Sequence, residues 1–206
     1  MLDFSLLYKF DKDMYYLPSE QEPILSADIG FFIGGNFVWC YDCGASEQAY
    51  NCLKQIDNIN IVISHFHNDH TGNMLRLTNT NEYYVGNYTY KHFNKGIVVD
   101  NDLYVEDKGL VHIFGLPNSH SKGSLAMEVN EKYVFIGDAS YGKHLNGHIV
   151  YNAQLLLEQY RKLSAIKADL CLQSHEMNNA VEKSMILAKF EKILSKRKKD
   201  EPNIIL

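Results

Sequence analysis

Short apolar runs separated by polar turn residues mark the first half of the chain, a pattern that predicts β-strands. Residues 27–33 are rich in apolar side chains, Gly-Gly-Asn follows at 34–36, and residues 37–41 resume the apolar run. Because glycine and asparagine favour tight turns, this segment predicts a β-hairpin. Residues 125–129 and 133–136, on either side of Asn-Glu-Lys, predict a second hairpin.

Other segments extend the pattern into a mixed, layered α/β architecture. The β-branched run at 60–64 predicts a buried strand that leads directly into His65. Further strands are predicted at 83–85, 97–99, 103–105, 111–114 and 169–173. Helices are predicted at 46–56, 71–77, 152–166 and 180–199 from caps and from apolar residues at helical spacing. This order of elements indicates packed layers of sheet and helix.

Length and charge narrow the class of protein. A chain of 206 residues with 46% hydrophobic and 22% charged residues suits a single domain over residues 1–206. Its net charge of −5 argues against a nucleic-acid partner, and no apolar stretch reaches the length of a membrane span. Acidic residues near the N-terminus, in place of a basic and apolar leader, favour a cytoplasmic location. No apolar stripe distinguishes an oligomeric interface from the core.

Three local patterns each have two interpretations. Cys40 and Cys43 form a CxxC pair, but they end a predicted strand, whereas a redox pair usually opens a helix; we expect core residues. The basic run at 196–199 closes a predicted helix, and cations favour a helix C-terminus, so we prefer this role to nucleic-acid binding. The aromatic-rich stretch at 83–93 fits either a cleft wall or core packing.

The strongest chemical signal is the segment 64–72, Ser-His-Phe-His-Asn-Asp-His-Thr-Gly. It places four potential metal ligands close together: His65, His67, Asp69 and His70. His65 and His67 are two apart, so on an extended backbone their side chains point the same way. Asp69 and His70 fall at the expected start of a helix. Imidazole and carboxylate ligands together suit zinc, iron or manganese better than calcium or magnesium.

The HxHxDH pattern resembles the central signature of metallo-β-lactamase-fold hydrolases, and the further residues expected from that resemblance follow in order. His120 lies in a loop before Gly-Ser, Asp138 follows glycine at a hairpin end, and His175 follows a short apolar strand. Asp42 follows the first predicted hairpin. The match spans residues 27–176. The third-ligand loop usually carries Pro-Gly; here it reads Pro-Asn-Ser, and we expect Asn118 to take the positive φ of that glycine.

The resemblance implies a four-layer αβ/βα sandwich with two metal sites at one edge, between two sheets. The implied cofactors are two divalent ions, zinc ahead of iron or manganese. Asp42 would hold the ligand loop through hydrogen bonds. Asp69 is the candidate catalytic residue, orienting the nucleophile or moving its proton. The implied ligands are His65, His67 and His120 for the first metal, and Asp69, His70, His175 and the bridging Asp138 for the second.

The resemblance favours a small glyoxalase II-like or lactonase-like enzyme that hydrolyses an ester, thioester or lactone of a small-molecule substrate. Lys143 and Tyr141, in the segment after Asp138, are candidates to bind a substrate carboxylate and an oxyanion. One alternative is an oxidoreductase resembling persulfide dioxygenases, with a single iron held by His65, His120 and Asp138. Another is a phosphodiesterase or nuclease of the same fold, against which the acidic balance weighs.

Overall fold

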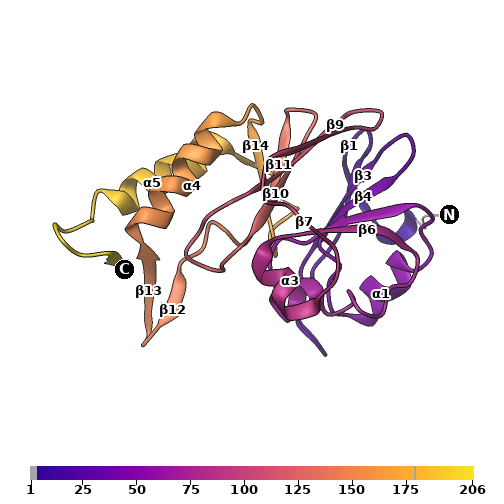
Figure 1. The fold of residues 1–206 in the computed structure, drawn as a ribbon, viewed down its shortest axis with the longest axis horizontal. Helices are drawn as coiled ribbons and strands as arrows, with labels where there is room; N and C mark the ends of the chain where they lie inside the picture. The colour runs from indigo at the N-terminus through magenta and orange to yellow at the C-terminus, as the bar shows by residue number, and fades with distance from the viewer. Residues whose placement is uncertain (1–3, 179) are drawn as a thin grey trace.

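The computed structural model describes residues 4–178 and 180–206. Two β-sheets pack face to face, and helices cover the outer face of each (Figure 1). The first part of the chain, up to β7, builds one sheet, and strands β8 to β11 with β14 and β15 build the other. This arrangement is the four-layer αβ/βα sandwich that the family resemblance implies.

The first sheet has seven strands in sequence order. Strands β1 to β4 pair antiparallel, and β4 to β7 pair parallel. The first predicted hairpin is confirmed as β3 and β4, with Ile33 opposite Val38. The strands are β1 (Tyr8–Asp11), β2 (Met14–Leu17), β3 (Ile29–Ile33), β4 (Val38–Tyr41), β5 (Ile59–Val62), β6 (Thr80–Val85) and β7 (Ile97–Val98).

The second sheet has six strands in the order β15-β14-β11-β10-β9-β8. The second predicted hairpin is confirmed as β10 and β11, and the parallel strand β14 lies beside β11. This pairing brings the C-terminal ends of β11 and β14 to the same edge of the sheet. The strands are β8 (Leu103–Glu106), β9 (Leu110–Gly115), β10 (Leu125–Val129), β11 (Tyr133–Gly137), β14 (Leu170–Gln173) and β15 (Val181–Glu182).

Helices and a small third sheet complete the fold. The third sheet joins β12 (Lys143–Leu145), β13 (His148–Asn152) and β16 (Asn203–Ile205). Within residues 4–178 and 180–206, no helix has the length and apolar character that a membrane crossing requires. The helices are η1 (Phe4–Leu6, a 3-10 turn), α1 (Glu47–Leu53), α2 (Asn68–Thr71), α3 (Asn87–Phe93), α4 (Ala153–Ala165) and α5 (Lys183–Leu194).

Alternation along the strands creates three apolar clusters from two sheets. In β4, Trp39 and Tyr41 point between the sheets, whereas Cys40 points toward α1. In β11, Phe135 points between the sheets, whereas Val134 points toward α4 and α5. A strand that is buried on both faces has apolar side chains at successive positions. This is why β4 and β11 appear in the sequence as short apolar runs without polar alternation.

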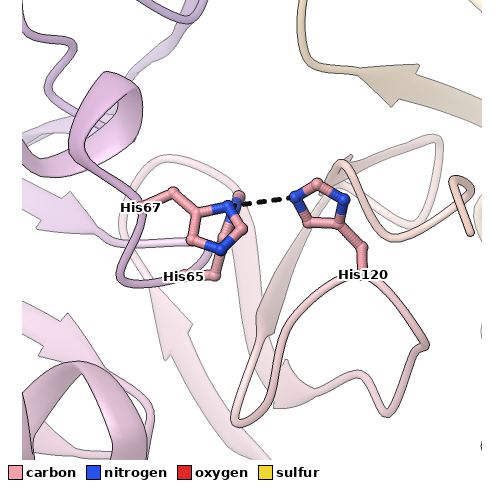
Figure 2. Close-up of side chains that lie close together, drawn as sticks. All are labelled: His65, His67 and His120. Carbon is pink, nitrogen blue, oxygen red and sulfur yellow. Dashed lines mark hydrogen bonds between the residues drawn. The ribbon is translucent and has the colours of Figure 1, made fainter. Parts of the chain in front are cut away.

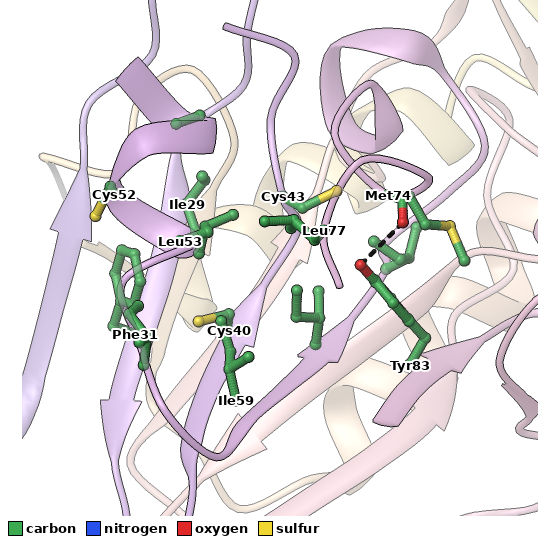
Figure 3. Packing of buried hydrophobic residues seen from close by; sticks show 14 of the residues in the cluster. Ile29, Phe31, Cys40, Cys43, Cys52, Leu53, Ile59, Met74, Leu77 and Tyr83 are labelled. Atoms are coloured by element: carbon green, nitrogen blue, oxygen red, sulfur yellow. Dashed lines mark hydrogen bonds between the residues drawn. The ribbon is translucent and has the colours of Figure 1, made fainter. Parts of the chain in front are cut away.

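The cluster beneath α1 holds three of the four cysteines (Figure 3). Cys40, Cys43 and Cys52 are free and buried. Burial raises the pKa of the Cys40 and Cys43 thiols, which disfavours the thiolate that redox chemistry needs. The structure therefore supports the core role that the sequence favoured.

Two predicted helices differ from the structure. The predicted helix at 71–77 is wrong: α2 covers Asn68–Thr71, and turns follow it. Asn73 explains the change, because its backbone N–H bonds to Gly44 and its side chain to Cys43 and Ser46, away from a helical pattern. The predicted helix at 180–199 shortens to α5, because Val181–Glu182 pairs with β14. Helix α3 and the third sheet were not predicted.

Candidate metal centre

The turn between β5 and α2 presents four of the predicted ligands. β5 is buried along its whole length, and Ser64 and His65 follow it at the edge of the sheet. His67 is the N-cap residue of α2 and has extended backbone angles. Asp69 and His70 lie in the single turn of α2, as the sequence predicted. This short change from strand to helix turns all four side chains toward one edge of the sandwich.

His65, His67 and His120 bring their ring nitrogens together (Figure 2). His65 Nε2 lies 2.9 Å from His67 Nδ1, and His120 Nε2 lies 3.1 Å from the same atom. His120 comes from the loop between β9 and β10, 53 residues beyond His67. Nitrogens about 2.0–2.1 Å from a tetrahedral zinc would lie about 3.3 Å apart, close to these separations.

A second donor group lies beside the first. Asp69 Oδ2 is 3.2 Å from both His70 Nε2 and His175 Nε2. Asp138 Oδ2 is 3.4 Å from His70 Nε2 and 3.9 Å from His175 Nε2. One ligand atom from each of these four residues lies within 4.8 Å of the others. The seven predicted ligands thus form two groups, divided as the resemblance implies.

Asp138 lies between the two groups. Its Oδ2 atom is also 3.4 Å from His120 Nε2, a member of the first group. The preceding residue, Gly137, has φ 60° and packs so closely that a Cβ atom there would lie 2.9 Å from Ser64 Cβ. A glycine is therefore required at the end of β11 to bring Asp138 against the ligand loop.

The donor set fits a bound cation, as two buried polar atoms show. His70 is fully buried, yet its Nε2 atom makes no hydrogen bond of good geometry, although two carboxylates lie nearby. The Oδ1 atom of Asp138 is likewise buried without a partner. Unpartnered buried polar atoms are costly. A divalent cation with imidazole and carboxylate ligands would supply the missing interaction.

Asp42 and Ser64 orient the loop that carries His65 to His70 through hydrogen bonds. Asp42 has φ 67° and is fully buried. Its Oδ1 accepts from the Ser64 backbone N–H at 2.7 Å, and its Oδ2 accepts from His70 Nδ1 at 2.7 Å. Ser64 Oγ lies 2.9 Å from His65 Nδ1. These contacts leave Nε2 of His65 and His70 pointing at the donor groups, as ligating histidines require. The sequence indicated Asp42, but nothing in it indicated Ser64.

Asp28 is a buried carboxylate near the site that the sequence did not reveal. Its Oδ2 accepts from the Met177 backbone N–H at 3.0 Å, and its Oδ1 accepts from the Ser19 N–H at 2.6 Å. Burial raises the pKa of Asp28, while bonds to the segment around His175 oppose that effect. His175 itself has φ 65°, so Asp28 braces a segment that contains a predicted ligand with a strained backbone. Asp28 and Met177 lie 149 residues apart along the chain, so no local sequence pattern predicts their contact.

Electrostatics keeps the first donor group neutral. Burial lowers the pKa of His65 well below its usual value, and it also lowers the pKa of His67 and His120. Neighbouring histidines act in the same direction on His65 and His120. Neutral imidazoles carry the free nitrogen lone pair that a metal ion needs.

The second group keeps its carboxylates ionised. Burial acts to raise the pKa of Asp69 and Asp138, but hydrogen bonds and charges from the neighbouring histidines lower both. Burial acts to lower the pKa of His70, but Asp42 and the other carboxylates outweigh it. The hydrogen bond to Asp69 raises the pKa of His175. The carboxylates thus draw positive charge into the space that a cation would occupy.

A pocket of about 340 Å³ opens beside the first donor group. His67 and His120 line it, and Lys122 and Lys143 bring two ammonium groups to it. An adjoining pocket of about 380 Å³ extends it over Leu116, Pro117 and Gly115. The two pockets share Tyr88, Asn118, Ser121, Lys122 and Leu155. Tyr88 lies in the aromatic stretch for which a cleft wall was one interpretation, and Phe66, within the ligand motif, also lines this cleft.

The structure separates the two candidate substrate residues. Lys143 lines the pocket beside His120, whereas Tyr141 lines a different one. The Tyr141 hydroxyl donates to the Ser174 carbonyl at 3.4 Å, and its backbone N–H donates to the Asp138 carbonyl at 2.9 Å. Burial raises the pKa of Tyr141 to about 12. Tyr141 therefore braces backbone next to two predicted ligands, and substrate contact by either residue stays a prediction.

Asn118 shapes the His120 loop differently from our expectation. The expected positive φ at Asn118 is wrong; in this loop Gly123 has it, with φ 67°. The Asn118 side chain instead accepts from the Ser121 N–H at 2.9 Å and donates to the Leu116 carbonyl at 2.9 Å. An asparagine can close a loop through its amide as well as through its backbone conformation.

Comparisons with known proteins establish the fold. No family model and no curated protein sequence matches the chain. A mutant flavo di-iron protein from Thermotoga maritima superposes with a TM-score of 0.72 at 14% identity, over 94% of this chain and 62% of its own. A metallo-β-lactamase from Pontibacter korlensis gives 0.69 at 14%, over 93% and 99%, and a metallo-β-lactamase superfamily protein from Sulfolobus tokodaii gives 0.65 at 16%, over 93% and 90%.

The chain therefore has the metallo-β-lactamase fold. It spans about 62% of the length of the flavo di-iron protein and 90% or more of the other two structures. The sequence-based fold class is confirmed.

Proposed function

We propose that the chain is a metal-dependent hydrolase that holds two divalent cations, zinc ahead of iron or manganese, and cleaves a small ester, thioester or lactone. The observation that carries the proposal is the position of Asp138 Oδ2, 3.4 Å from a histidine of each donor group. A carboxylate oxygen shared in this way suits two adjacent cations better than one.

Two such cations, when bound, would lower the pKa of a water molecule toward neutrality and would polarise a substrate carbonyl. The chain's own residues would hold the cations and orient the attacking water molecule. His65, His67 and His120 are neutral donors, so they add no proton that would compete for the site. Asp69 belongs to the second donor group and its carboxylate is ionised, so it would orient a water molecule by accepting a hydrogen bond from it.

The substrate would enter through the double pocket beside His120. Lys122 and Lys143 offer ammonium groups to a carboxylate on the substrate, and Phe66 and Tyr88 offer apolar surface. The adjoining pocket would take an apolar part of the acyl chain along Leu116. These features support an anionic substrate with an apolar portion.

A second candidate is an iron oxidoreductase on the same fold. The structural likeness to a protein named as flavo di-iron favours considering iron, and His120 Nε2 lies 3.4 Å from Asp138 Oδ2. With His65, these residues make the two-histidine, one-carboxylate set that suits a single non-haem iron. This alternative leaves the second donor group, with the buried His70, without a role.

Metal content tests the proposal first. We would purify the protein without chelator or added metal and measure metals by elemental mass spectrometry, then assay thioester, lactone and phosphodiester substrates. We expect two divalent ions per chain, with loss of metal and of activity in His120→Ala and no loss in His148→Ala, an exposed histidine on β13. One iron per chain would favour the oxidoreductase, activity on phosphodiesters alone would favour the nuclease, and absence of metal would contradict all three.

A further inference from the structure

A separate pocket of about 370 Å³ lies between the β12–β13 hairpin and α5. Three lysines of α5 and the turn that follows it, Lys189, Lys192 and Lys196, line one side. Their spacing of three and four residues puts them on one helix face. His144 and Tyr141 line the side formed by the hairpin and the segment before it. None of the described residues that line this pocket carries a carboxylate side chain.

These lysines differ from other lysines of the chain. In residues 4–178 and 180–206, none of the three has a carboxylate oxygen within 4.0 Å, whereas five other lysines do. Glu176 acts on Lys189 from outside the lining, but burial outweighs it and lowers the pKa of the Lys189 ammonium group. In a chain with net charge −5, the pocket is a local concentration of positive charge.

Part of this wall is held in place before any ligand arrives. Lys189 Nζ donates to the Ser140 carbonyl at 3.2 Å and lies 5.6 Å from the centre of the Tyr141 ring. The Tyr151 hydroxyl donates to the same carbonyl at 3.1 Å. An ammonium group has three N–H donors, so two of those on Lys189 remain for a ligand.

Helix stabilisation alone does not explain the cluster. Cations near a helix C-terminus offset the negative end of the helix dipole, which accounts for the basic run at 196–199. Lys189, however, lies in the interior of α5, outside the last turn, where that effect is small. The opposite wall of the pocket is apolar, with Ile149, Ile193 and Leu206. The pocket therefore combines a cationic side with an apolar side.

We propose that this pocket binds a small phosphorylated molecule. Its phosphate or diphosphate group contacts the three lysines, and its apolar or aromatic part lies against Tyr151 and Ile149. This pocket is separate from the pocket beside His120: His144 lines the first and Lys143 lines the second, because neighbouring side chains along β12 point to opposite faces. The proposal does not depend on the hydrolase activity.

Calorimetric titration of the metal-loaded protein with inorganic pyrophosphate and with ADP tests this site. We expect both probes to bind, and Lys192→Gln/Lys196→Gln to weaken binding by about tenfold or more, because charge-assisted contacts are lost. The matched control is Lys198→Gln/Lys199→Gln, which removes the same charge from exposed positions outside the lining. We expect its affinity to stay within about twofold of the wild type, because distant exposed charges are screened.

The possible outcomes separate clearly. Tighter binding of ADP than of pyrophosphate indicates a nucleotide, and equal affinity indicates recognition of the phosphate groups alone; both support the site. Unchanged affinity in the pocket variant would place the anion at the candidate metal centre and overturn the proposal. Equal losses in the two double variants would show diffuse charge attraction and overturn it as well, as would a lack of binding by either probe at millimolar concentration. All four lysines are exposed, so circular dichroism should show an intact fold in both variants.

Discussion

Asp42 is fully buried, and each of its carboxylate oxygens accepts a hydrogen bond, one from the Ser64 backbone and one from the His70 ring. Burial raises the pKa of this carboxyl group, and the two bonds oppose that effect. Asp42 thereby sets the orientation of the His70 imidazole, which is also buried. One carboxylate therefore holds both the Ser64 backbone and the ring of His70, a predicted ligand.

Replacing Asp42 by asparagine tests that coupling. Asp42→Asn keeps the volume but loses the charge, so we expect zinc affinity to fall about 10–100-fold, as for other residues that orient ligating histidines. Competition titration with a chromophoric chelator measures the affinity. Asp107→Asn is the matched control, because Asp107 is also buried but accepts its bonds from the turn before β4 and from Trp39. Equal zinc affinity in wild type and Asp42→Asn would contradict the role.

Asp107 predicts a pH dependence of stability. Burial acts to raise the pKa of Asp107, but four hydrogen bonds outweigh it and lower the pKa below its usual 3.8. A lowered folded-state pKa stabilises the protein above the unfolded-state value, and that stabilisation is lost as pH falls through the folded-state value. We expect Asp107→Asn to lower the free energy of unfolding by about 1–3 kcal/mol at pH 7, with the difference narrowing below about pH 4.

Urea unfolding of metal-free protein between pH 3 and pH 7 measures this difference. Asp100→Asn serves as the control, since Asp100 is exposed and accepts one bond from the Asn87 side chain. Its curve should follow that of the wild type. A difference for Asp107→Asn that stays constant with pH would show that lost hydrogen bonds, not ionisation, account for the effect.

At the residue scale, the sequence indicated some residues of the candidate site and missed others. The family resemblance carried by the motif at 64–72 implied two groups of ligands, and the structure brings the seven side chains together in the same two groups. Asp28 was missed because its partners are backbone N–H groups of two other segments, and Ser64 was missed because its contacts with Asp42 and the His65 ring form only in the folded chain. The conformation of Asn118 was predicted wrongly, because an asparagine amide can substitute for a turn in more than one way.

Caps account for where the predicted helices begin. Ser46 Oγ accepts from the Ala49 N–H, and α1 starts at the next residue after Ser46. The Asn152 side chain accepts from the N–H groups of Gln154 and Leu155, and α4 begins at Ala153. Both helix starts match the sequence-based expectation, because a capping contact spans only two or three residues.

Asn152→Ala should destabilise the protein by about 1 kcal/mol, the usual cost of removing an N-cap. Thermal and urea unfolding measure the loss. Arg161→Ala, an exposed position on the same helix, is the control and should stay within about 0.5 kcal/mol of the wild type. A loss in Asn152→Ala no larger than in Arg161→Ala would contradict the stabilising role of the cap.

The elements that the sequence misjudged share a physical cause. The segment at 71–77 carries apolar residues at helical spacing, but Asn73 directs three hydrogen bonds toward the turn at residues 43–46. The third sheet is formed by strands of three and five residues, and it pairs β13 with a segment more than 50 residues away. Such pairing depends on tertiary contacts, not on periodicity.

At the scale of the whole molecule, the candidate metal centre joins the two halves of the sandwich. His65 to His70 follow β5 in the first sheet, whereas Asp138 follows β11 and His175 follows β14 in the second. A cation held by both sheets binds the folded state and has no comparable site in the unfolded chain. Metal binding should therefore act as a clamp on the fold.

Removal of metal should lower the thermal midpoint. A ligand present at about a thousand times its dissociation constant adds about 4 kcal/mol to the free energy of unfolding. Calorimetry with and without a chelator measures the shift, and zinc should restore it. His175→Ala should show a smaller shift, and the exposed His148→Ala should match the wild type. An identical midpoint with and without chelator would contradict a metal shared by the two sheets.

Periodicity and caps in the sequence predicted many of the strands and helices and the layered class of the fold, whereas the family resemblance carried by the HxHxDH motif implied the set of candidate ligands. Tertiary packing alone placed Asp138 against both donor groups, Lys143 and Tyr141 in different pockets, and Lys189, Lys192 and Lys196 in one pocket with His144. Those relations join segments that lie far apart along the chain, so they depend on how the two sheets pack, which no local pattern encodes.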